Sequence, residues 1–322
     1  MSESFTKVSD FYEPQVQAAY ITEAPLDSAE MFAAGVIARN PLIDVKGAST
    51  NATPFLSGFG GASRIVEGTA VEADALDAGA CIAPVQTDII VKGIGDLTRR
   101  AAGMADPVRA FAEPFATAWP YEFQNRALQA LVALSGAASM SGNVLDISAL
   151  SGDAAKFTTG TAVDAAGKLG DKADTLGAIV MHSAVRAALT KAGVIVAQTV
   201  ASAQGQDVYR NGSIYLLNGR QVIADDRCPV DTGVYTSFFL GKGAFGFNED
   251  TSIDPALAFE LERIGNASVS RLISRRFYVL HPVGMTYGGA VPVTDVAYQA
   301  SASWVRKWAA KNVPIVIFKH KI

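Results

Sequence analysis

The sequence predicts an α+β fold, and three observations support this prediction. A long helical pattern runs from about 107 to 135, with apolar residues at steps of three and four. Short strand-like runs follow, and two of them flank Asn218-Gly219, a dipeptide typical of two-residue hairpin turns. A glycine-rich, strand-like stretch at 51–95 precedes the long helix.

Residues 1–50 are expected to form an extended arm with one short helix near 28–37. They mix three prolines with short apolar runs, and they hold seven acidic residues against three basic ones. The rest of the chain has 24 of each, so the arm accounts for the net charge of −4. An arm of this kind buries little surface by itself, so we expect it to lie on a neighbouring molecule.

Residues 51–95 are interpreted as a long β-hairpin. Candidate strands lie at 64–66 and 82–91, and an acidic connection joins them. Because a hairpin with so thin a core is marginal in isolation, it should pack on another surface.

The strongest helix is expected to begin at Asp106 as N-cap with Pro107 as its first residue. About 30 residues at ~1.5 Å each would span ~45 Å, which is long for a compact domain. Pro114 and Pro120 lie inside the pattern, and each should bend or interrupt the helix because proline lacks the backbone donor.

The remainder of the chain is expected to alternate between strands and helices. Residues 141–172 have the composition of connections, and a second helix at 174–192 should stop at Gly193. Further expected elements are strands at 213–217, 220–223, 234–240, 276–280 and 313–319, a helical or loop segment at 255–264, and a helix at 294–310.

A G-x-G-x-x-G pattern is formed by Gly241, Gly243 and Gly246, after the predicted strand at 234–240. A dinucleotide site needs a helix directly after this pattern, because the pyrophosphate binds at the helix N-terminus. Residues 247–255 instead have the composition of a loop. We therefore interpret the glycines as positions of close backbone packing.

The tripeptide Asp231-Thr232-Gly233 matches the D-T-G motif of aspartic proteases. That chemistry needs two carboxylates that share one proton, and the chain holds no second D-T-G or D-S-G. The preferred interpretation is a turn in which Gly233 takes a positive φ.

Composition narrows the possible classes of function. The charge of −4 argues against a basic nucleic-acid reader. Cys81 and Cys228 stand far apart, and His182, His281 and His320 are scattered, so we expect no metal site, no cofactor and no catalytic residues. His182 is expected to be a satisfied core histidine on the helix at 174–192. No signal peptide or membrane span is recognisable in the sequence.

The order of these elements resembles the major capsid proteins of tailed bacteriophages, the Hong Kong phage-type coat fold. The resemblance covers essentially the whole chain. Its motifs are Thr53-Pro54-Phe55, Ala105-Asp106-Pro107, Met181-His182-Ser183-Ala184-Val185, the segment 219–226 with Pro229, Tyr235-Thr236-Ser237-Phe238, Gly241-Lys242-Gly243-Ala244, Leu280-His281-Pro282-Val283-Gly284, Trp304-Val305-Arg306 and Lys311-Asn312-Val313.

The resemblance implies five regions. They are an N-terminal arm at 1–50, an E-loop hairpin at 51–95, a P-domain spine helix at 96–140, an A-domain at 141–290, and a return helix and strand of the P-domain at 291–322.

The resemblance also implies a function as a non-enzymatic subunit of hexamers and pentamers that tile an icosahedral shell around double-stranded DNA. The implied partners are other copies of the chain, a scaffolding protein, a portal and in some cases a decoration protein, with weak contact to DNA and none to a membrane. Assembly in the host bacterial cytoplasm and a final place in the virion are implied as well. The alternatives are an encapsulin-like nanocompartment shell, a soluble enzyme that uses the glycine loop or the D-T-G motif, and a tail-tube subunit.

Two expectations concern maturation of such a shell. About 50 residues precede the hairpin, too few for an independent scaffolding domain, so we expect a separate scaffolding protein and a retained arm. In some relatives, a covalent bond between an E-loop lysine and an asparagine of a neighbouring subunit links the subunits of the shell. Residues 47–91 hold no lysine, and Arg64 stays protonated, so we expect a non-covalent shell.

Overall fold

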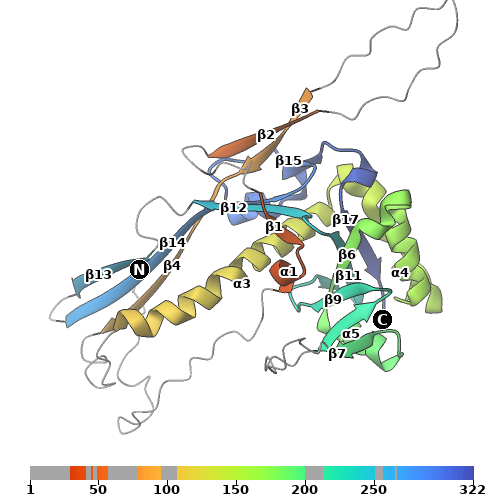
Figure 1. The fold of residues 1–322 in the computed structure, drawn as a ribbon, viewed down its shortest axis with the longest axis horizontal. Helices are drawn as coiled ribbons and strands as arrows, with labels where there is room; N and C mark the ends of the chain where they lie inside the picture. The colour runs from red at the N-terminus through yellow and green to blue at the C-terminus, as the bar shows by residue number, and fades with distance from the viewer. Residues whose placement is uncertain are drawn as a thin grey trace, which may run out of the picture.

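The computed structural model describes residues 30–40, 45, 49–56, 78–95, 107–199, 213–250, 257–264 and 267–322. Figure 1 shows an elongated molecule with two parts. Long strands and the first half of one long helix form one end, and a compact sheet with short helices forms the other. A separate two-stranded hairpin projects from the middle.

Each part contains one main sheet, and helices connect the two. The α-helices are α1 (Glu30–Ala33), α3 (Pro107–Ser135), α4 (Thr159–Ala166), α5 (Ser183–Lys191) and α6 (Asp295–Gln299). The 3-10 helices are η2 (Ala138–Asn143), η3 (Gly152–Ala155), η4 (Gly167–Thr175), η5 (Ser301–Ser303) and η6 (Ala310–Asn312).

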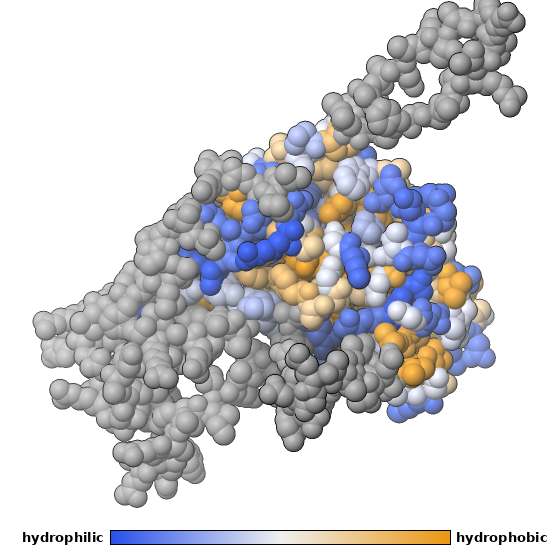
Figure 2. Space-filling model, viewed as in Figure 1, coloured by the Kyte–Doolittle hydropathy of each residue, from blue (hydrophilic) through white to orange (hydrophobic). Residues whose placement is uncertain are grey.

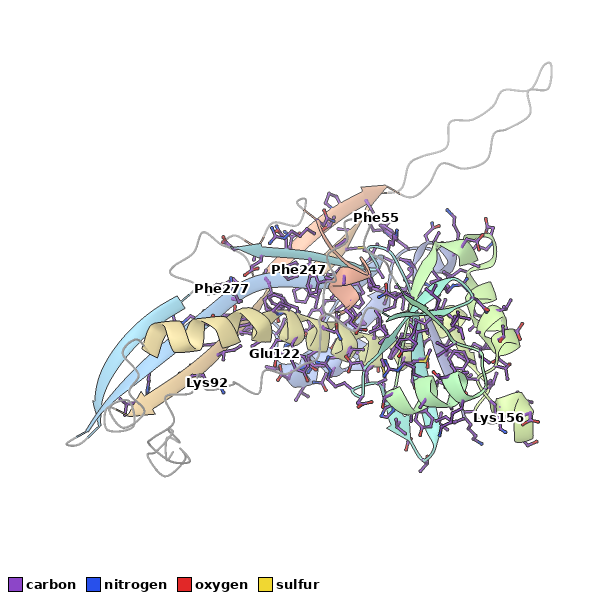
Figure 3. All side chains as sticks on the ribbon, turned by 60° about the horizontal axis from the view of Figure 1, so that its bottom comes forward. Phe55, Lys92, Glu122, Lys156, Phe247 and Phe277 are labelled. Carbon is purple, nitrogen blue, oxygen red and sulfur yellow. The ribbon has the colours of Figure 1, made fainter. Side chains whose placement is uncertain are left out.

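The five-stranded sheet consists of β1 (Ile37–Arg39), β12 (Phe245–Asp250), β14 (Ala267–Pro282), β13 (Leu257–Ile264) and β4 (Gln86–Gly95). The 16-residue strand β14 is its centre, because it pairs antiparallel with β12, β13 and β4. Helix α3 lies along one face of this sheet, as Figure 3 shows for the strands that carry Lys92 and Phe277. The indole N–H of Trp119 fixes this packing by donating to Ser274 Oγ at 2.9 Å.

The eight-stranded sheet runs in the order β5 (Val144–Asp146), β17 (Ile315–His320), β11 (Val234–Gly241), β6 (Leu176–Met181), β9 (Arg220–Ala224), β8 (Ser213–Leu217) and β7 (Val196–Thr199), with β10 (Val230–Asp231) paired to β11. Both faces of its centre are buried. Phe238 and Leu240 point into the core beneath the end of α3, whereas Phe239 points into a second core with residues of α4 and α5.

The spine helix is confirmed over Pro107–Ser135, and it continues through Pro114 and Pro120. Of the two expected effects, bending or interruption, interruption is wrong, because α3 packs against the five-stranded sheet and tertiary packing supports a helix that has lost single backbone bonds. The expected N-cap, Asp106, lies outside the described residues.

The hairpin differs from its prediction. Its strands are β2 (Thr50–Leu56) and β3 (Ala78–Pro84), paired antiparallel, while the candidate strand at 64–66 lies outside the described residues. The predicted single strand at 82–91 is wrong, because the chain leaves the hairpin at Val85 and enters β4 of the five-stranded sheet.

The predicted helix at 174–192 is half wrong. Its second half is α5, which ends before Gly193 with φ +69 as expected, but its first half is the strand β6. The segment 141–172 also holds more than connections, since it contains β5 and the helix α4. The segment expected to be helix or loop at 255–264 forms strand β13 over 257–264.

The prediction of a C-terminal helix at 294–310 is also wrong. Only Asp295–Gln299 is α-helical, and the chain then forms η5 and β16 (Trp304–Arg306), which pairs with β15 (Met285–Tyr287). The closing strand predicted at 313–319 is confirmed as β17, which lies in the eight-stranded sheet. The strands at 213–217, 220–223, 234–240 and 276–280 and the Asn218-Gly219 turn, with φ of 51 and 76, are confirmed.

Candidate assembly surfaces

The end of the N-terminal segment is built into the core. Met31 is fully buried, and the ring of Phe32 lies 5.5 Å from that of Phe247 and 6.3 Å from that of Phe123. Strand β1 then pairs in parallel with β12, which places Ile37 beside Phe245. The expected extended arm therefore becomes part of the folded subunit at residue 30, and the short helix predicted near 28–37 is confirmed as the four residues of α1.

A buried polar relay connects this anchor to both sheets. Gln124 Oε1 on α3 accepts the backbone N–H of Met31 at 3.2 Å, and its amide donates to Asp225 Oδ2 at 2.8 Å. Asp225 also accepts from Arg227 Nε and Nη2, and the Arg227 guanidinium lies 4.1 Å from the ring centre of Tyr121. Burial alone would raise the pKa of Asp225, but the hydrogen bonds from Arg227 and Gln124 outweigh it and leave that pKa below its usual value.

The root of the projecting hairpin is held by a few specific contacts. The backbone N–H of Ile82 donates to Thr286 Oγ1 at 2.9 Å, and the ring of Phe55 packs edge-on against Trp308 at 6.1 Å. Gly79 lies beneath Phe55, where an added Cβ would come within 2.6 Å of the ring. The direction of the hairpin is therefore set by packing on β15 and on the segment after β16.

A charged cluster ties the C-terminal segment to α3. Arg126 on α3 binds Asp88 of β4, with 3.1 Å between Nη2 and Oδ1, and it also contacts Asp295 of α6. Tyr278 of β14 donates its hydroxyl to the same Asp88. One guanidinium thus connects three elements that lie far apart in the sequence.

The two apparent catalytic motifs have structural roles. Gly241 lies against Pro314, where an added Cβ would approach within 2.7 Å, and Gly243 takes a φ of +66 in the turn between β11 and β12. The segment after the glycines is a strand and not the expected loop, and no helix begins there. Thr232 and Gly233 both have positive φ in the turn between β10 and β11, which confirms the interpretation of D-T-G as a turn.

The histidines and cysteines are separate from one another. Cys81 and Cys228 are buried free thiols, and burial raises the pKa of Cys81. His182 caps helix α5 and is half-buried, so it is not the core histidine expected from the sequence. Among the described residues, no three His, Cys, Asp or Glu side chains gather as metal ligands would, and no described helix meets the length and apolarity needed to span a bilayer.

Neither the relay nor the contacts at the hairpin root could be predicted from local sequence patterns. Gln124 is the one available sign, because it is a polar residue directly after Phe123 in the apolar pattern of the helix. Asp225, Thr286 and Trp308 become partners only through contacts between segments distant in sequence.

The exterior carries scattered exposed apolar side chains. Figure 2 shows small apolar islands between hydrophilic residues on the face it displays. Exposed large apolar side chains occur on several elements, including Ile89 on β4, Val163 on α4, Val196 on β7 and Val296 on α6.

Comparison with known proteins gives consistent results. A family model for Major capsid protein 13-like proteins matches residues 83–262, more than half of the chain. The major capsid protein of Bacillus phage SPP1 is 29% identical over 342 residues, and the match covers 99% of each chain.

Solved structures share the fold at low sequence identity. The capsid of Ralstonia phage GP4 has a TM-score of 0.52 at 9% identity, over 89% of this chain and 87% of that one. A structure from Mycobacterium phage Bobi has a TM-score of 0.52 at 14% identity, over 97% of both chains. The predicted tailed-phage coat fold is confirmed, and the protein is a structural subunit of a virion capsid that assembles with itself. The chain belongs to the Major capsid protein 13-like family.

Proposed function

We propose that this coat protein forms hexamers and pentamers that tile an icosahedral shell around double-stranded DNA. The observation that carries the proposal is the match to a phage major capsid protein, which is 29% identical over 99% of both chains. The projecting hairpin supports it, because β2 and β3 pair only with each other among the described residues. A two-stranded sheet gains stability when a neighbour covers it.

The parts of the subunit have distinct proposed roles. The five-stranded sheet with α3 serves as the P-domain, the eight-stranded sheet with α4 and α5 as the A-domain, and the β2–β3 hairpin as the E-loop. Residues 1–29 serve as the arm. The two sheets define the domains better than contiguous stretches do, because β12, β13 and β14 belong to the first sheet and β17 to the second.

The proposed partners beyond other copies are a separate scaffolding protein, a portal and a decoration protein, with assembly in the host bacterial cytoplasm. Contact with the packaged DNA is weak and non-specific. The net charge of −4 supports this point, since tight binding to phosphates requires a surplus of basic residues.

Sedimentation and negative-stain microscopy of the purified protein, with scaffold co-expressed, test the proposal. Closed shells or ring-shaped capsomers are expected. A compact monomer under all conditions would contradict it, and so would stacked rings of a tail tube. Shells that contain a host enzyme in place of DNA would indicate a nanocompartment.

A further inference from the structure

The free edge of strand β2 carries a proline near its middle. Within the described part of the chain β2 pairs with β3 alone, so the other edge of its seven residues faces no strand there. Ala52 and Pro54 on this strand are both exposed. An uncovered strand edge presents a row of backbone N–H and C=O groups, and such a row can pair with a strand of another molecule.

The strand register shows which backbone groups lie on this edge. In an antiparallel pair, residues that exchange hydrogen bonds alternate with residues whose N–H and C=O groups point outward. Ala52 lies opposite Ile82, and Ile82 donates its N–H to Thr286 Oγ1 at 2.9 Å instead of to β2. Ala52 is therefore an outward-pointing position, and the alternation makes Pro54, opposite Ala80, the next one.

A contact at the hairpin root gives the same alternation independently. Val85 donates its N–H to the carbonyl of Ser49 at 3.0 Å, so these two residues form a hydrogen-bonded pair. Steps of two along β2 then make residues 51, 53 and 55 bond to β3 and leave residues 50, 52, 54 and 56 pointing outward. Pro54 thus takes a position where its missing N–H costs the hairpin no hydrogen bond.

Pro54 removes a donor from the free edge of β2. Two β2 strands that paired antiparallel about this point would each lose one hydrogen bond, and proline on an edge strand is a device by which proteins block such pairing. On the opposite edge of the hairpin, Thr286 already accepts the N–H of Ile82, so that donor is also occupied. Both edges of the hairpin are therefore closed to an added strand at one position.

We propose that Pro54 prevents the β2 edges of two copies of this chain from pairing, so that isolated subunits stay separate until they assemble. Apart from Pro54, strand β2 is suited to such pairing, because its threonines and Phe55 favour strands and it contains no charged residue. The proposal concerns the free subunit and does not depend on the geometry of the shell.

Substitution of Pro54 in the isolated subunit tests the proposal. P54A restores the outward N–H with a small side chain, and P54T restores it with a β-branched one. In sedimentation velocity without scaffold, both should associate at a concentration at least ~10-fold lower than wild type, because a symmetric pair regains two hydrogen bonds. A52T is the matched control, since it adds the same side chain at the neighbouring outward position without a new donor. It should sediment as wild type does.

A second proline provides a rescue. Because the N–H of Ala52 also points outward, A52P in the P54T background removes a donor from the same edge and should restore the sedimentation of wild type. Amide hydrogen exchange locates the contact, since exchange in residues 50–56 should become at least ~10-fold slower in associated P54T.

Folded P54A and P54T subunits that sediment like wild type at every concentration would overturn the proposal. Association that A52T shares, that A52P does not reverse, or that leaves exchange in residues 50–56 unchanged would place the contact elsewhere and would overturn it as well. Circular dichroism melts show whether the variants fold. Loss of folding in both P54A and P54T would assign Pro54 to folding of the hairpin, which is also contrary to the proposal.

Discussion

The side-chain amide of Gln124 donates a hydrogen bond of 2.8 Å to the carboxylate of Asp225 in the interior of the protein. The same side chain accepts the backbone N–H of Met31. It therefore links three parts of the fold: the segment that anchors the N-terminus, the spine helix, and the turn after β9. The relay fixes the position of α1, the element at which the described part of the chain begins.

Replacing Gln124 with leucine should destabilise the subunit by about 2 kcal/mol, because the buried Asp225 loses a donor and Met31 loses its acceptor. Chemical denaturation of the isolated subunit measures this loss. N125L is the matched control, since Asn125 is the next residue on α3 and, within the described part of the chain, its side chain bonds to Glu122 at 3.3 Å. Equal stability of the two variants would show that the relay contributes nothing.

Truncation at two points should distinguish residues that are needed for shell assembly from residues that are needed for folding of the subunit. Deleting residues 2–28 should leave the subunit folded with an unchanged unfolding midpoint, but shells should form poorly or melt at a lower temperature. Deleting residues 2–40 should prevent folding, because it removes the buried Met31, Val36 and Ile37 together with strand β1. Circular dichroism melts of the subunits and of the shells distinguish these effects. Shells of the shorter deletion that match wild type in yield and melting temperature would contradict the prediction.

Parts of the fold with strong local signals could be predicted from the sequence. The spine helix has a long apolar period, and the Asn218-Gly219 turn requires two residues with positive φ. The continuous apolar run Leu176–Met181 could not be assigned by period, because a strand buried on both faces has none. Because the helix α5 follows this run directly, the sequence pattern predicts one helix over both segments, which is wrong for β6.

Long-range pairing explains the remaining differences. The segment at 294–310 has apolar spacing compatible with a helix, yet Trp304–Arg306 pairs with Met285–Tyr287 and the Trp304 indole donates to the carbonyl of Tyr298. These contacts depend on residues brought together only in the folded chain. The same holds for the assembly surfaces, since the exposure of Ile89 and Val91 depends on which face α3 covers.

The subunit should lose stability as the pH falls from 6.5 to about 4. Burial lowers the pKa values of His281 and His320 to about 4, while both titrate near 6.5 in the unfolded chain. Between these values the unfolded state binds more protons, so stability is full above pH 6.5 and falls as the pH approaches 4. The loss amounts to about 3 kcal/mol for each histidine.

Denaturation of the isolated subunit at several pH values measures this dependence. H281Q should reduce the slope of stability against pH by about half, because it removes one of the two buried histidines. The fold should be retained, since glutamine can still donate to the Met285 carbonyl that His281 Nε2 contacts at 2.8 Å. A stability that is constant from pH 7 to 4.5 would contradict the burial of both neutral imidazoles.

Mature particles should be held together without covalent bonds between chains. An isopeptide weld needs an unprotonated lysine on the hairpin, and residues 47–91 contain none. Lys92 lies on β4 opposite Leu272, in the five-stranded sheet and outside the β2–β3 hairpin. Particles boiled in denaturing detergent should therefore release single chains of 33.7 kDa, with or without reductant. Oligomers that persist with reductant would show a covalent weld, whereas bands that reductant removes would point to oxidation of Cys81 or Cys228 after unfolding.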